Sequence, residues 1–178
     1  VLNKPFLFGI TPIYSVNSNA LTGFVKLIYN TYFEDQNLYN INYGLAVTHS
    51  SFAENAFVTK TVPYVNFHFR DATDLRSNQL KSLSLRYVSI EKDFVEVEDD
   101  NAVAPPYNVF NIRYIDDYNG FKKYHKWFLD AQFSDQFGKL SLNYELRRRS
   151  NKNQFYNVRL YAGAFLYSKI PTAEQNFD

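Results

Sequence analysis

The chain has 178 residues, enough for one domain with a sizeable core, and its net charge is +1. So small a net charge gives no support for a nucleic-acid partner. Cysteine is absent, which excludes disulfides and thiolate metal sites. No apolar stretch reaches the roughly 18 residues that a membrane helix needs. A membrane-spanning form would therefore have to be a closed β-barrel.

Apolar and polar residues alternate with a period close to two along almost the whole chain. Within residues 24–34, Val25 and Leu27 are apolar while Lys26 between them is charged. Residues 39–48 alternate more cleanly around Leu45. A helix would need apolar residues three and four apart, which neither segment has. The pattern predicts strands in both segments, preceded by one near residues 6–14.

The same alternation predicts six more strands, which brings the total to nine. They lie at residues 65–70, 82–87, 109–114, 126–134, 140–147 and 156–166. Most of the links between them are short, polar and turn-like, and two are longer, at residues 71–78 and 91–106. Short links imply antiparallel hairpins, since parallel strands need a long crossover. The predicted fold class is all-β, an antiparallel meander, with residues 1–178 as a single segment excerpted from a longer chain.

Three features favour a transmembrane β-barrel of the outer-membrane type over a soluble β-protein. Many predicted strands are about ten residues long, as membrane strands are. The apolar faces carry Tyr, Phe or Trp near their ends, and the opposite faces carry charged residues. The residues predicted to face the membrane are Val25, Leu27, Leu45, Leu83, Leu85, Trp127, Leu142 and Leu160. The residues predicted to face the lumen are Lys26, Arg86, Arg113, Asp130, Glu145, Arg147 and Arg159. The alternative is a soluble ligand-binding β-barrel or carbohydrate-binding β-sandwich, with the apolar faces inward.

Three stretches of the second half resemble a family of large outer-membrane proteins. They are residues 83–88 (LSLRYV), 107–114 (YNVFNIRY) and 155–166 (FYNVRLYAGAFL). They are similar to the barrel region of proteins that begin with a gluzincin aminopeptidase-like zinc metallopeptidase domain, and the resemblance covers residues 80–178. It implies an outer-membrane location and a catalytic domain outside this segment. The family's His-Glu-x-x-His zinc motif is not present in residues 1–178.

The candidate chemistry of the segment itself is sparse, and we expect no catalytic, cofactor-binding or metal-binding residue in it. His49, His68 and His125 fall on different predicted strands, too scattered for a ligand set. Arg147-Arg148-Arg149, with Lys152 following, could pair with phosphates of lipid or lipopolysaccharide, or could form a polar strand end that prevents edge association. The expected role is anchoring or pore formation. The expected partners are membrane lipid, lipopolysaccharide, and further strands or a soluble domain of the same chain.

Overall fold

The computed structural model describes residues 5–15, 20–34, 37–53, 56–70, 77–94, 107–151 and 154–169. All of the regular secondary structure in these ranges is β, in nine strands. They are β1 (Phe6–Ser15), β2 (Ala20–Tyr32), β3 (Leu38–Ala53), β4 (Ala56–Phe69), β5 (Gln79–Phe94), β6 (Tyr107–Asn119), β7 (Lys123–Phe133), β8 (Phe137–Asn151) and β9 (Gln154–Ser168).

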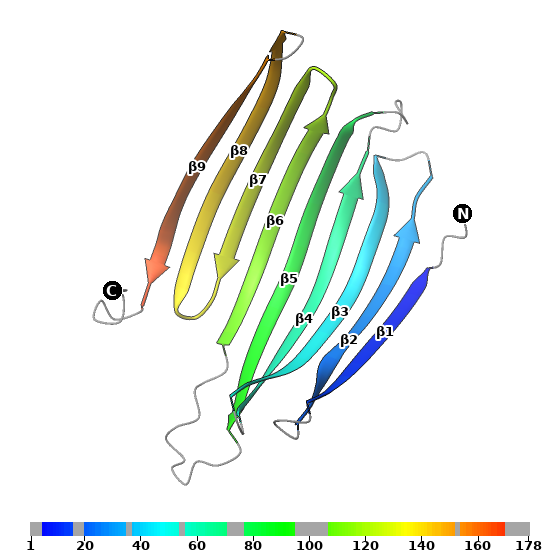
Figure 1. The fold of residues 1–178 in the computed structure, drawn as a ribbon, viewed down its shortest axis with the longest axis vertical. Helices are drawn as coiled ribbons and strands as arrows, with labels where there is room; N and C mark the ends of the chain where they lie inside the picture. The colour runs from blue at the N-terminus through cyan, green and yellow to red at the C-terminus, as the bar shows by residue number, and fades with distance from the viewer. Residues whose placement is uncertain are drawn as a thin grey trace.

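The strands form one sheet in which each pairs with its neighbours in sequence, in the order β1 to β9. Every pair is antiparallel, which confirms the predicted all-β meander and its nine strands. The sheet is not closed within the described residues, because β1 pairs there with β2 alone and β9 with β8 alone. In Figure 1 these two edge strands lie on opposite sides of the sheet and run in the same direction.

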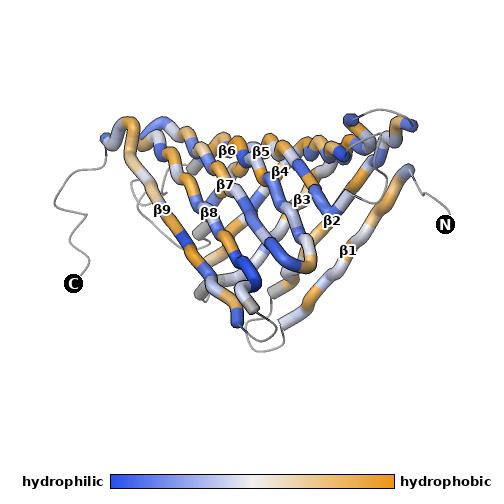
Figure 2. Tube along the Cα trace, turned by 90° about the horizontal axis from the view of Figure 1, so that it is seen from above, coloured by the Kyte–Doolittle hydropathy of each residue, from blue (hydrophilic) through white to orange (hydrophobic). Residues whose placement is uncertain are grey.

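The sheet is a single curved layer. Seen from above in Figure 2, the strands follow an arc, with β5 and β6 at its back and the edge strands β1 and β9 at its two sides. The strands are 10 to 16 residues long. A tilted strand of about 9–11 residues, at about 3.4 Å per residue, is long enough to cross a bilayer. The longest strands of this sheet exceed that length.

Several strands extend beyond their predicted bounds. The predicted strand at residues 65–70 begins at Ala56, and β5 continues to Phe94, so the long link does not begin at residue 91 as predicted. The register explains the difference, because Glu91 still pairs with Thr59 across the β4–β5 ladder. Backbone pairing with a neighbour thus maintains the strand where the side-chain alternation fades.

Two irregular positions have a direct backbone cause. Pro63 lies in the central strand β4 and has no N–H to donate, and the β4–β5 ladder has no partners at Val62 and Pro63. Gly23 has a positive φ of 150°, and a Cβ there would collide with the carbonyl oxygen of Thr11. Glycine is therefore the residue that fits this point of the β1–β2 ladder.

The sheet has almost no conventional hydrophobic core. Among the described residues, the buried apolar side chains are Ile41 and Ala56, whereas Asn40, Asn111 and Asp130 are buried polar ones. Large apolar side chains are exposed on every strand from β1 to β9 except β4. The part of the chain that the structure describes contains no helix long and apolar enough to cross a membrane.

Candidate functional site on the polar face

The register divides the sheet into two faces of opposite character. We call the face that carries Leu85 the apolar face, and the face that carries Ser84 the polar face. One row of directly paired residues crosses the apolar face through all nine strands: Phe6, Tyr29, Tyr43, Val65, Leu85, Ile112, Ala131, Leu140 and Ala164. A row on the polar face crosses β2 to β9: Asn30, Asn42, Asn66, Ser84, Arg113, Asp130, Ser141 and Gly163.

The register brings the two sets of predicted residues onto these two faces. Val25, Leu27, Leu45, Leu83, Leu85, Trp127, Leu142 and Leu160 share the apolar face. Lys26, Arg86, Arg113, Asp130, Glu145, Arg147 and Arg159 share the polar face. That the apolar face meets lipid and the polar face meets a lumen stays a prediction.

Asp130 is the centre of a hydrogen-bonded network on the polar face. Its carboxylate accepts from Arg113 Nε at 2.8 Å, from Asn111 Nδ2 at 3.0 Å and from Gln132 Nε2 at 2.8 Å. Asn111 in turn accepts a hydrogen bond from Arg86 Nε at 2.6 Å. Asp130 and Asn111 are only 4% and 2% exposed. A buried carboxylate and amide are stable here because their polar atoms have partners.

Four asparagines, Asn30, Asn40, Asn42 and Asn66, occupy neighbouring positions on the polar face over β2 to β4. Asn42 donates to Asn30 and, at 2.8 Å, to Asn40. Its own amide oxygen lies 2.8 Å from Nε2 of His68. These residues form an amide–imidazole ladder, in contrast to the network on β5 to β7, which contains arginine and aspartate side chains.

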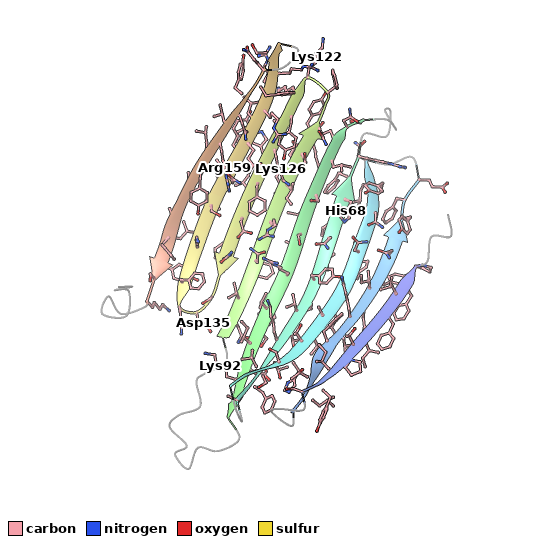
Figure 3. The ribbon with its side chains drawn as sticks, viewed as in Figure 1. His68, Lys92, Lys122, Lys126, Asp135 and Arg159 are labelled. Carbon is pink, nitrogen blue, oxygen red and sulfur yellow. The ribbon has the colours of Figure 1, made fainter. Side chains whose placement is uncertain are left out.

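Two further ion pairs lie on the polar face between neighbouring strands. Lys126 Nζ is 3.4 Å from Asp117, and Arg159 Nε is 3.6 Å from Glu145. Figure 3 shows Lys126 and Arg159 toward the same end of the sheet. Arg159 also donates to the amide oxygen of Asn143 at 3.1 Å. These side chains are partly exposed, so their pairing contributes little to stability.

The register also assembles a basic rim of five residues: Lys122, Lys123, Arg147, Arg148 and Arg149. The sequence alone indicated only the three arginines as a cluster. The backbone of Arg149 donates to the carbonyl of Lys122 at 3.0 Å, and Lys123 pairs directly with Arg148. The two lysines thereby join the predicted arginine run 147–149, and Figure 3 shows Lys122 at the end of the sheet. The Lys122-Lys123 dipeptide, at the start of β7, was the sequence signal that could have identified the rest of the rim. Phe121, 82% exposed, lies beside this rim under the guanidinium of Arg149, at 5.2 Å.

The three histidines do not form a metal site. His49 contacts the hydroxyl of Thr59 at 2.9 Å, His68 contacts Asn42, and His125 stacks on Tyr118 with ring centroids 5.2 Å apart. Among the described residues, no group of three or more His, Cys, Asp or Glu side chains could hold a metal ion.

The apolar face carries a shallow hollow across β1 to β6. It has a volume of about 520 Å³ and an almost wholly apolar lining that includes Leu27, Leu45, Val65, Leu85 and Phe110. Its lining offers little for orienting a polar substrate, and its main chemical capacity is to contact hydrocarbon.

Comparison with protein-family models, curated proteins and solved structures finds no match to this chain.

Proposed function

We propose that this chain forms part of the wall of a transmembrane β-barrel of the outer-membrane type, with the apolar face toward lipid and the polar face toward a hydrated lumen. Its role would be to anchor its parent protein in the membrane or to form a pore.

The observation that carries the proposal is the inverted burial over β6 to β8. Asn111 and Asp130 on the polar face are nearly inaccessible, whereas Trp127 and Leu140 on the apolar face are 40% and 41% exposed. A soluble sandwich buries its apolar face against a second layer, and the described residues form a single layer. A soluble barrel turns its apolar face inward, away from water. Hydrocarbon would satisfy an apolar face that this part of the chain leaves uncovered.

Aromatic side chains support the proposal by their position on the apolar face. Tyr87, Phe110 and Phe133 form one row of paired residues, and Trp127 pairs with Tyr144 in another. The two rows are six residues apart on β7, about 20 Å along the strand. On β7 and β8, the apolar-face residues between the two rows are aliphatic: Leu129, Ala131, Leu140 and Leu142. Membrane barrels carry such aromatic girdles at their two interfaces.

The directions of the two edge strands, β1 and β9, determine how many further strands an antiparallel barrel would need to close. Neighbours alternate in direction, so β1 and β9 run the same way, and pairing them directly would make one parallel seam. An odd number of added strands keeps every pair antiparallel and brings the total to the even number of bacterial single-chain barrels. We assign these strands to the same chain outside residues 1–178.

The basic rim fits lipid phosphate, including that of lipopolysaccharide. Lys123 and Arg148 are opposite each other on the apolar face, where two like charges repel unless an anion lies between them. Guanidinium groups pair bidentately with phosphate, and in the proposed barrel the neighbouring exposed Phe121 would insert at the membrane interface. The resemblance to gluzincin proteins extends the proposal to a zinc peptidase unit of the parent protein, outside residues 1–178. A zinc-dependent peptidase assay of the full-length protein tests that extension.

Paired cysteine variants test the membrane assignment. Ser84→Cys and Leu85→Cys place a thiol on opposite faces of β5 at adjacent positions, in the full-length protein with any other cysteine replaced. Each is labelled with an environment-sensitive fluorophore and reconstituted into liposomes that contain brominated lipid. We expect bromine to quench the probe at residue 85 and to leave the probe at residue 84 water-accessible. Equal quenching at both sites, or a protein that stays monodisperse without detergent or lipid, would refute the barrel and favour a soluble ligand-binding protein.

A further inference from the structure

Among the described side chains, the polar face has a large excess of positive charge, although the chain as a whole has a net charge of only +1. The described side chains of its strands include ten cations and three carboxylates. The cations are Lys26, Lys60, Arg86, Lys92, Arg113, Lys126, Lys139, Arg147, Arg149 and Arg159, and the carboxylates are Asp117, Asp130 and Glu145.

The apolar face lacks this imbalance. Among the described side chains of its strands, three cations (Lys81, Lys123 and Arg148) accompany two carboxylates (Glu91 and Asp116). The excess of cations is therefore a property of one face of the sheet, and the register that defines that face keeps the charges together.

Local pairing does not cancel the excess. Each of the three carboxylates is already within 2.8 to 3.6 Å of a cation, in the pairs with Arg113, Lys126 and Arg159. Lys26, Lys60 and Lys92 are exposed on the polar face, and none of them forms an ion pair with a carboxylate of the described residues. Figure 3 shows Lys92 at the end of the sheet opposite to Lys122.

A water-filled passage lined by one sign of charge and walled by low-dielectric material attracts counter-ions and excludes co-ions. Such clefts raise rates of entry on the order of tenfold or more. Rings of lysine and arginine are the means by which anion pores select their ions.

We propose that the polar face lines a path that prefers small anions over cations. This inference rests on the barrel proposed above and adds to it the class of solute. The three exposed lysines attract the anion and the remaining cations of the face maintain the positive potential along the strands. The Asp130 network holds the strand register and takes no part in contacting the solute.

Reversal potentials in planar bilayers test the proposal with the full-length protein. Under a KCl gradient we expect a reversal potential of the sign set by chloride, with an anion-to-cation permeability ratio above one. Replacing Lys26, Lys60 and Lys92 together by Gln should lower that ratio. Lys60→Glu should lower it more than Lys81→Glu, a matched change on the apolar face of the neighbouring strand.

The outcomes separate the two proposals. A protein that does not enter the bilayer refutes the barrel itself. An inserted protein with the labelling pattern expected for residues 84 and 85 that conducts no ions, or that prefers potassium, overturns the anion path and leaves the barrel standing. Equal effects of Lys60→Glu and Lys81→Glu would also overturn it, because the selectivity would then not depend on the polar face.

Discussion

Removing the carboxylate of Asp130 is expected to destabilise the sheet more than any other single charge removal on the polar face. In Asp130→Ala, the guanidinium of Arg113 and the amides of Asn111 and Gln132 lose a common acceptor. Breaking one side of a buried ion pair costs about 3–5 kcal/mol. Arg113 keeps 30% of its side chain exposed, so water recovers part of the loss. We therefore expect about 3 kcal/mol.

Asp117→Ala is the matched control, since it removes a carboxylate from a partly exposed pair. Its oxygen is 3.4 Å from Lys126, and the two side chains are 29% and 33% exposed. Exposed pairs contribute about 0.2–1 kcal/mol. Asp130→Asn should fall between the two, because the amide keeps an acceptor oxygen but loses the charge.

The assay is equilibrium unfolding of the full-length protein in detergent or liposomes. The midpoints are compared between variants whose free energy of unfolding depends on denaturant concentration with the same slope. Equal, small shifts for Asp130→Ala and Asp117→Ala would refute the reasoning. They would show that water solvates the Asp130 carboxylate as it solvates that of Asp117.

Two further predictions test the assignment of the faces, and a third tests the packing within the sheet. Leu85→Arg should reduce membrane insertion by about 2–4 kcal/mol, measured as the folded fraction in liposomes, while Ser84→Arg should change it little; similar losses at both sites would contradict the face assignment. Trp127, the one tryptophan of residues 1–178, should contribute blue-shifted emission that brominated lipid quenches, read as a difference spectrum against Trp127→Phe; unquenched emission would place it in water. Gly44→Ala places a methyl group against the ring of Tyr64 and should lower the free energy of unfolding by about 1–3 kcal/mol. Gly9→Ala adds its methyl group to open space and should leave the free energy of unfolding nearly unchanged in the same assay.

The sequence was sufficient to predict the strands and their faces because alternation with period two is a local signal. Leu45 and Lys26 could be assigned to opposite faces with no knowledge of pairing, and the structure places them so. Strand ends were less predictable. β4 begins at Ala56 because its backbone pairs with β3 and β5 over residues whose own pattern is irregular. Partners set these ends, and partners are not encoded in one segment alone.

The network around Asp130 was predictable only as a set of polar residues. Asn111 reads as an ordinary polar strand residue, yet it is the least exposed side chain of those buried in the described residues. Its burial depends on the register, which places it directly opposite Arg86 on one side and Gln132 on the other. The sequence also could not decide which face turns outward, because alternation looks the same for a soluble sheet and its inverse.

In this sheet, pairs of polar side chains on neighbouring strands specify the register, as a hydrophobic core does in other proteins. The three ion pairs of the described residues all join residues directly opposite each other on neighbouring strands, and Asn30 and Asn42 are likewise opposite. A slip of one residue would move every one of these side chains onto the apolar face, away from their present partners and, in the proposed barrel, into lipid. In a sheet with hardly any buried apolar side chains, the polar face therefore specifies the register. The same register gathers the excess lysines and arginines on that face, so the feature that fixes the fold also fixes the charge of the proposed passage.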